Sequence, residues 1–229
     1  GLEILGVSLP DSAWRMRLAI LGQLLLQIGH RLLPGLFIGK GADSDREAAE
    51  EELRLYEPIF WIEIPKASVL LRLMVLRALN HSERHNLPYG CIAGYAAVGI
   101  ALDYLRLFGL AYKYLHRAAA LAEDYGHPDV LARVYHGLAG HYLQTGKLEE
   151  EIDCLQRCSR LYKEIGDLLH WGWALDGLAL VLCYQGDLSE ALDRVHEMVP
   201  IGEEGNIRLV QCLSGASMGN TLMCMGRYE

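Results

Sequence analysis

Several features that would point to particular protein classes are scarce in this sequence. Basic residues do not outnumber acidic ones: 21 Lys and Arg stand against 29 Asp and Glu, and the formal net charge at pH 7 is −8. A nucleic-acid-binding domain usually carries a basic face, so the charge balance argues against nucleic acid as a partner. No block of five or six like charges occurs either, which argues against an acidic tail or a basic arm.

A long apolar run is also missing. The run over residues 18–28 is short and contains Gln23 and Gln27, whereas a membrane-spanning helix needs about 20 apolar residues. Asp11 precedes the run and no small-residue cleavage site follows it, so it does not fit a secretory signal. We therefore expect a buried or interfacial helix here, and no membrane contact through residues 13–38.

The six cysteines form no C-x-x-C pair. Spread cysteines in a helical chain of this size indicate reduced thiols, which predicts a cytoplasmic protein. A chain of 229 residues with 52% hydrophobic and 22% charged residues can bury a substantial core. The sequence begins with Gly1 rather than Met and ends inside a repeat, at Glu229 three residues after Gly226, so we expect it to be a piece of a longer protein.

What the sequence does contain is a repeat, because two sets of turn-forming residues recur with a period near 40. The first set consists of Asn86, Gly126, Gly166 and, one position short of the next full period, Gly205; the second consists of Gly146, Gly186 and Gly226. Asn and Gly most easily take the left-handed conformation that closes a helix. The two sets therefore predict pairs of helices joined by short turns. No stretch alternates apolar and polar residues for long enough to predict a sheet.

Side-chain sizes repeat with the same period. A small residue recurs within the first helix of each pair and another within the second helix, which lets the two helices approach closely. The first-helix positions are Gly99, Ala139, Ala179 and Gly219; the second-helix positions are Ala111 and Ala191.

This pattern of bulky, Leu-small and Tyr positions followed by Ala resembles the tetratricopeptide repeat over residues 46–229. Three features depart from it: the period is 40 rather than 34, Glu151 stands where a small residue is expected, and the proline that ends each repeat is missing. The resemblance implies an all-α solenoid of antiparallel helix pairs over residues 43–229, with the last repeat truncated. Residues 1–42 are expected to form an apolar N-terminal helix and a linker.

Segments such as residues 76–84 and 184–192 are similar to the helical repeats that follow ATPase modules in large bacterial signalling proteins. That resemblance implies a non-catalytic interaction or sensor scaffold in signal transduction, with a protein, a peptide or upstream domains of the same chain as partner. The alternative is the regulatory region of a multidomain enzyme, namely a class III adenylate or guanylate cyclase or a serine/threonine kinase with an ATPase module. A third interpretation is a self-contained adaptor attached to a membrane through residues 13–38.

In tetratricopeptide arrays the first helices of the pairs form the concave face, where partners bind. When positions within the repeat are matched to those of the family, the resemblance implies nine candidate groove residues. They are Asp103, Tyr104, Arg133, His136, Gln144, Trp173, Asp176, Tyr184 and Asn220. Two tryptophans begin one of these helices. We expect one of Trp171 and Trp173 to pack between repeats and the other to line the groove.

Partial motifs for chemistry are better explained by structure. Residues 35–41 suggest a P-loop, but only three residues separate Gly35 from Gly39, and no Ser or Thr follows Lys40. His81 and His85 lie one turn apart without the spacing of a zinc protease. We expect no catalytic residue, no metal site and no cofactor in this stretch.

Overall fold

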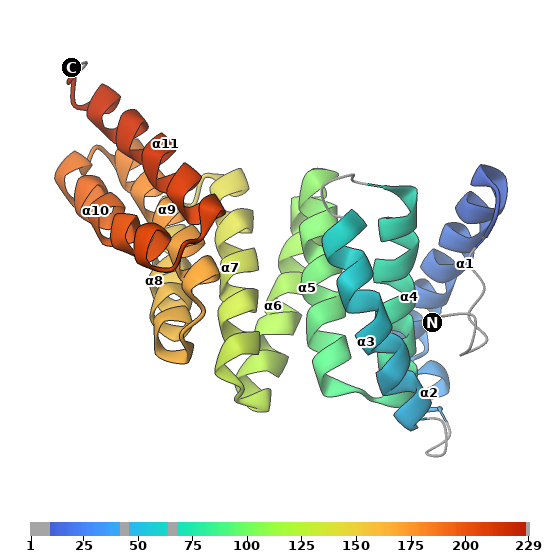
Figure 1. Ribbon diagram of the computed structural model, residues 1–229. Coiled ribbons are helices and arrows are strands. Elements are labelled where there is room, and N and C mark those ends of the chain that lie inside the picture. Colours follow the sequence, from blue (N-terminus) through green and yellow to red (C-terminus); the bar gives the residue numbers. More distant parts are fainter. Residues whose placement is uncertain (1–9, 42–45, 64–67, 228–229) are drawn as a thin grey trace. The chain divides into compact units, whose positions relative to one another are not determined.

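The computed structural model describes residues 10–41, 46–63 and 68–227, and this part of the chain is all helical, without strands. Its helices pack in consecutive pairs (Figure 1). They are α1 (Ala13–Leu32), α2 (Pro34–Phe37), α3 (Arg46–Glu63), α4 (Val69–His85), α5 (Pro88–Tyr104), α6 (Phe108–Tyr125), α7 (Pro128–Thr145), α8 (Leu148–Ile165), α9 (Leu168–Gln185), α10 (Leu188–Glu204) and α11 (Arg208–Cys224). The prediction of an all-α chain is confirmed.

Left-handed residues separate the helices from α4 onward at a constant interval, which is half the period of the sequence repeat. They are Asn86, Arg106, Gly126, Gly146, Gly166, Gly186, Asn206 and Gly226. The prediction for Gly205 is wrong, because this residue keeps a helical φ of −75° and Asn206 closes the turn with a φ of 48°. Asn tolerates this conformation because its short side chain can bond to the local backbone. Each helix with its turn therefore occupies half of one repeat.

The chain divides into two compact units, Gly1–Gly99 and Ile100–Glu229, called unit 1 and unit 2 below. In unit 1, α4 packs against both α1 and α3. Tyr56 of α3 and Met74 and Ala78 of α4 form a buried apolar cluster. Ser12 caps the start of α1: its hydroxyl accepts a hydrogen bond from the Arg15 backbone N–H, as expected of an N-cap.

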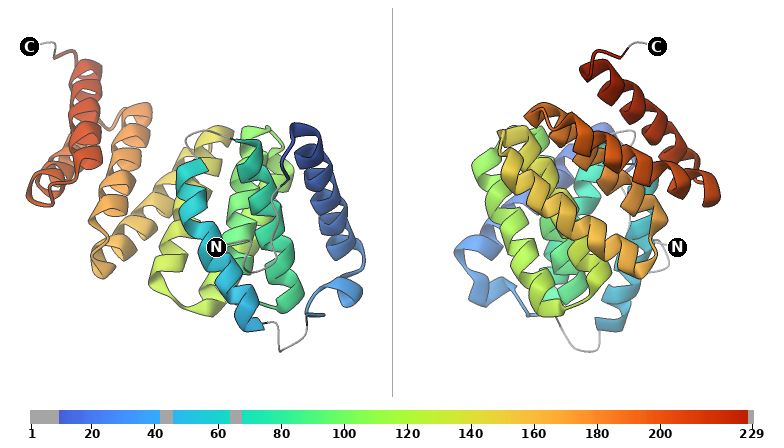
Figure 2. Two further views of the ribbon diagram at one scale, coloured as in Figure 1. Left: turned by 45° about the vertical axis from the view of Figure 1, so that its right-hand side comes forward. Right: turned by 90° about the vertical axis from the view of Figure 1, so that its left-hand side faces the viewer.

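In unit 2, each helix from α7 onward packs on its successor, and α11 also packs on α9 (Figure 2). The predicted small positions Ala139, Ala179, Ala111 and Ala191 are buried, which confirms their packing role. Gly219 differs: it is exposed, and nothing described lies within 4 Å of the place where its Cβ would be. No described helix follows α11 to pack on that position.

Glu151 occupies the position in α8 that Ala111 and Ala191 occupy in their helices, and it is 3% exposed. One carboxyl oxygen, Oε2, is buried without a hydrogen-bond partner among the described residues. Burial raises the pKa of this carboxyl from 4.5 to about 7, because a charged group is poorly solvated there. The departure from the repeat pattern at this residue thus places an ionisable group in the core of unit 2.

Candidate functional site

The candidate groove residues come from the odd-numbered helices of unit 2. Arg133, His136 and Gln144 lie on α7; Trp173, Asp176 and Tyr184 lie on α9; Asn220 lies on α11; Asp103 and Tyr104 lie at the end of α5. Tyr104, Gln144, Trp173 and Tyr184 are exposed, whereas Arg133, His136, Asp176 and Asn220 are half-buried and Asp103 is fully buried. Contacts within the structure bring some of these side chains together and leave others apart.

His136 and Trp173 form the centre of an aromatic cluster with Tyr162 and His170. The centroids of the His136 and Trp173 rings are 5.4 Å apart in an edge-on arrangement. Tyr162 lies 6.0 Å from His136 and stacks on His170 at 5.3 Å, and His170 lies 6.3 Å from Trp173. Trp173 nevertheless remains 43% exposed. The aromatic cluster therefore holds an indole in place while leaving nearly half of it open to a partner.

The start of α9 fixes the position of the aromatic cluster. Asp167 caps the helix by accepting a hydrogen bond from the His170 backbone N–H at 3.2 Å, and its other carboxylate oxygen lies 2.7 Å from Nδ1 of the His170 ring. One aspartate thus orients both the helix and the imidazole. His136 is held neutral, since burial and the neighbouring His170 lower its pKa to about 4.

Two further candidate residues form hydrogen bonds, one between two helices and one between successive turns of the same helix. Asp176 accepts a hydrogen bond from Ser217, which joins α9 to α11, and burial raises the pKa of this aspartate, opposed by the Ser217 bond. Arg133 donates a hydrogen bond to Asp129 at 3.0 Å within α7. Asp176 therefore links α9 to α11, whereas Arg133 is engaged within α7.

Asp103 lies in a buried pair rather than on an exposed face. Its carboxylate is 2.7 Å from Nδ1 of His141 on α7, and both side chains are almost fully buried. Beside this pair, the rings of Tyr112 and His116 of α6 lie 4.0 Å apart with tilted planes, and Tyr112 lies 6.0 Å from His141. The pair was not predicted, although the separation of its two residues in the sequence, 38 positions, is close to one repeat period.

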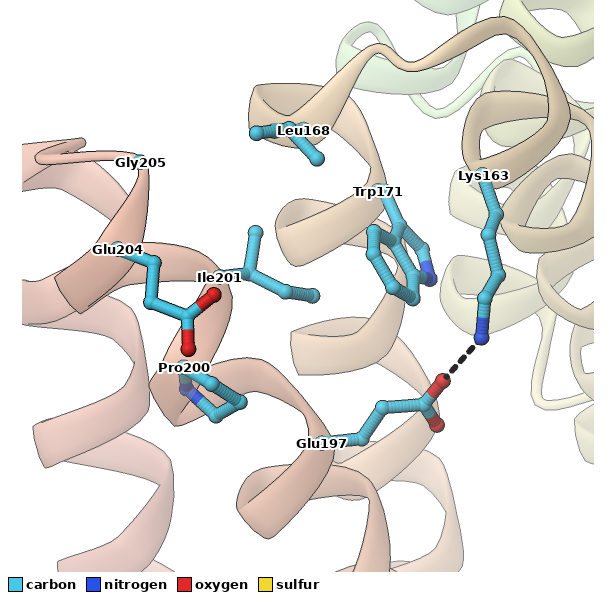
Figure 3. Close-up of a pocket in the computed structure, with 8 residues that line it drawn as sticks. All are labelled: Lys163, Leu168, Trp171, Glu197, Pro200, Ile201, Glu204 and Gly205. Carbon is cyan, nitrogen blue, oxygen red and sulfur yellow. Dashed lines mark hydrogen bonds and ion pairs between the residues drawn. The ribbon is translucent and has the colours of Figure 1, made fainter.

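A cleft that the sequence did not predict lies between α8, α9 and α10 (Figure 3). It has a volume of about 310 Å³. Trp171 forms one wall, with the Lys163 ammonium 4.6 Å from its ring and 3.2 Å from the Glu197 carboxylate. Pro200 and Ile201 form the other wall. The two neighbouring tryptophans therefore serve different sites: Trp171 lines this cleft, and Trp173 belongs to the aromatic cluster.

Unit 1 contains a buried carboxylate that the sequence pattern did not predict. Glu83 of α4 is 1% exposed and accepts hydrogen bonds from Gln27 at 2.8 Å, from Arg31 and from Tyr95; its Oε2 also lies 2.6 Å from Nδ1 of His30. Gln27 also donates to Asn80 at 2.7 Å. These contacts form what we call the Glu83 clamp, which fastens α1 to α4 through polar groups. The partners on α1 and α4 are far apart in the sequence, so no local pattern could have revealed it.

The partial motifs have structural roles. The backbone N–H groups of Gly39 and Gly41 donate to the carbonyls of Glu83 and Arg84 at 2.9 and 2.8 Å, so this loop covers the C-terminal end of α4. The rings of His81 and His85 lie 4.6 Å apart at the same end. Among the described residues, no group of three or more His, Cys, Asp or Glu side chains is arranged to hold a metal ion. Nor does any described helix combine the length and apolar character that crossing a membrane requires.

Comparison with known proteins adds no assignment: the chain matches no protein-family model and no curated protein.

Proposed function

We propose that unit 2 is a tetratricopeptide-like solenoid whose odd-numbered helices bind a protein or peptide, and that it acts as a scaffold without catalysis of its own. The observation that carries this proposal is the aromatic cluster. A half-exposed Trp173 held by His136 of α7 and His170 of its own helix has the properties of a binding hot spot, because a pre-positioned indole loses little entropy on binding.

The constant interval between left-handed turns supports the solenoid part of the proposal. This interval gives successive helices nearly the same length and the same left-handed closing turn, as in arrays built from one repeated motif. Contacts between odd-numbered helices, such as His136–Trp173 and Asp176–Ser217, are those of stacked first helices.

The partner that this face fits is a peptide with an apolar anchor and flanking polar groups. Trp173 offers apolar surface, and the half-buried Arg133 and Asp176 are polar side chains on α7 and α9, the helices that carry His136 and Trp173. His136 is neutral at physiological pH, since its pKa is about 4, so the cluster presents no histidine charge at that position. An apolar residue next to a hydrogen-bonding group would be recognised best.

The test is selection of peptides from a random library displayed on phage, followed by calorimetry with the selected peptides. We expect Trp173→Ala to weaken binding by about tenfold or more, as loss of a hot-spot tryptophan does. Trp171→Ala is the matched control, because this indole lies in the cleft between α8 and α10. Peptides that bind both variants as tightly as the wild type would contradict the proposal.

The setting in a large bacterial signalling protein rests on the resemblance of the repeats alone. In that setting, partner binding to unit 2 would bias an ATPase, cyclase or kinase elsewhere in the parent protein. The test is the mass of the native protein, detected in cells with an antibody raised against this chain. A band several times heavier than 25.6 kDa is expected, and a band at that mass would contradict this setting.

A further inference from the structure

Helix α1 carries its apolar side chains on the outside. Trp14, Leu18, Leu21, Leu25, Ile28 and Leu32 form a stripe in which every member is between 48% and 73% exposed; we call it the α1 stripe. We propose that the α1 stripe is a self-association surface, which packs against the α1 stripe of a second copy of the chain, parallel and in register.

The polar contacts of α1 fix this orientation. At about 100° per residue, the α1 stripe lies opposite the face that carries Gln27 and His30, the two fully buried residues of α1. That inner face is tied to α4 through the Glu83 clamp. Turning the leucines inward would leave Glu83 buried without its α1 partners Gln27, His30 and Arg31, which is costly. The α1 stripe is therefore held outward by the fold itself.

The spacing within the α1 stripe identifies a helix as its occupant. Its members follow one another at steps of four, three, four, three and four residues. This is the heptad seam along which two helices interlock side chains, and it is narrower than the apolar face of a helix that lies on a bilayer. All six positions are apolar, so a seam of the same composition can pair with it throughout.

The available area is sufficient for a stable pair. Leu24, Leu33 and Leu36 extend the exposed apolar surface beside the α1 stripe and beyond its end, and are 43%, 53% and 69% exposed. Together with the stripe they offer roughly 800 Å² per copy, the area that one partner contributes to a standard protein interface. An unshielded surface of this size is larger than monomeric proteins usually expose.

The charges beside the seam favour parallel pairing. Arg17 flanks the seam on one side. In a parallel pair in register it would face Gly22 of the second copy, since flanking positions five residues apart meet. In an antiparallel pair it would face Arg31 of the second copy, where it would bring a second positive charge beside the Arg31–Glu83 ion pair of that chain. The parallel arrangement therefore avoids a repulsion that the antiparallel one contains.

Sedimentation equilibrium of the full chain tests the self-association. We expect twice the single-chain mass of 25.6 kDa for the wild type, and the single-chain mass for the double variant Leu21→Glu, Leu25→Glu. The matched control is Leu209→Glu, Met223→Glu, which places charge on comparably exposed residues of α11 and should leave the mass doubled. Circular dichroism checks that each variant keeps its helix content.

Three outcomes would overturn the proposal. The first is a wild type of single-chain mass at concentrations up to about 100 μM, the weak end of specific association. The second is a doubled mass that only the α11 variant removes. Capture of single chains by lipid vesicles through the α1 stripe would show the occupant to be a membrane, which also overturns it.

Cross-linking tests the direction of pairing. In a background with the exposed Cys212 and Cys224 changed to Ser, Ile28→Cys should give a cross-linked pair, because parallel pairing in register places position 28 beside its own copy. Antiparallel pairing would instead join Ile28→Cys of one copy to Leu18→Cys of another in a mixture of the two variants. A cross-link only in the mixture would overturn the parallel arrangement.

Discussion

Arg106 occupies the turn after α5 with a φ of 58°. The equivalent positions in the later turns, Gly146, Gly186 and Gly226, are glycines with similar φ values of 71–90°. A residue with a Cβ is strained in this conformation by about 1–2 kcal/mol. Glycine avoids this strain, but part of the advantage is offset because glycine makes the unfolded chain more flexible. Arg106 is thus a point where the repeat departs from the residue that its geometry favours.

We expect Arg106→Gly to raise the free energy of unfolding by about 0.5–1 kcal/mol. Urea denaturation followed by circular dichroism measures the difference. The reverse change, Gly146→Arg, provides the matched control and should lower the free energy of unfolding by a similar amount. A destabilised Arg106→Gly variant would show that this arginine contributes contacts that outweigh its strain.

Glu151 should make stability depend on pH. Its pKa in the folded protein is about 7, above the ordinary value of 4.5, so the fold favours the protonated form. The contribution of the neutral carboxyl to the free energy of unfolding is therefore fully present below pH 4.5, and it is lost as the pH rises through 7. At pH 8 the loss amounts to about 3 kcal/mol.

Glu151→Ala should remove this loss and restore the residue type found at Ala111 and Ala191. The variant is expected to be more stable than the wild type at pH 8, and the difference should shrink toward pH 4.5. Melting temperatures over this pH range measure it. Glu150→Ala, at an exposed neighbouring position, should leave the pH profile of the wild type unchanged. Parallel profiles for wild type and Glu151→Ala would disprove the expectation.

At the scale of elements, the Glu83 clamp decides how α1 attaches to unit 1. Replacing the carboxylate by an amide in Glu83→Gln keeps the shape but leaves Arg31 without its counter-charge. Breaking a buried ion pair from one side costs about 3 kcal/mol. We expect α1 to detach more often, so that hydrogen exchange of its amides accelerates relative to those of α3.

Glu50→Gln is the control for that experiment. Glu50 is an exposed acid in α3 that pairs with Arg46, and exposed pairs contribute less than about 1 kcal/mol. Exchange of the α1 amides should stay at the wild-type rate in this variant. Equal acceleration in both variants would mean that α1 responds to net charge rather than to the Glu83 clamp.

The positions of the helices could be predicted from the sequence far better than which face of each helix is buried. Turn residues act locally, so Asn86, Gly126 and the rest marked the helix ends correctly, and the one wrong position, Gly205, is the direct neighbour of the true one. The facing of α1 depends instead on Glu83, which is distant in the sequence. The apolar composition of α1 favours a helix that buries its leucines, and the polar contacts to α4 reverse that orientation.

In the candidate site, too, the positions of residues along the repeat were predictable from the sequence, whereas their burial was not. Phase along the repeat placed His136 and Trp173 on facing helices, and the structure brings their rings together. The phase did not predict that Asp103 would be buried against His141, because burial depends on which side chain of the neighbouring helix lies opposite. The Lys163–Glu197 cleft likewise depends on packing between α8 and α10.

At the scale of the whole chain, α11 is the least covered helix of unit 2. Only Val210, Ser214 and Thr221 of this helix are buried, whereas Met223 is 55% exposed. A repeat is stabilised by the neighbours on both of its sides. We expect amides of α11 to exchange hydrogen faster than those of α9, measured by mass spectrometry of peptides. Equal protection of the two helices would contradict this.

The even spacing of the left-handed turns has a consequence for how such a chain changes over time. Alternate turns lie one full repeat apart, so a recombination event between the matching stretches of the gene adds or removes one complete helix pair. The helices on either side of the junction keep their length and their direction of turn. Chains of this type can therefore be lengthened or shortened by copying errors in the gene while each remaining helix still meets a neighbour of the shape it requires.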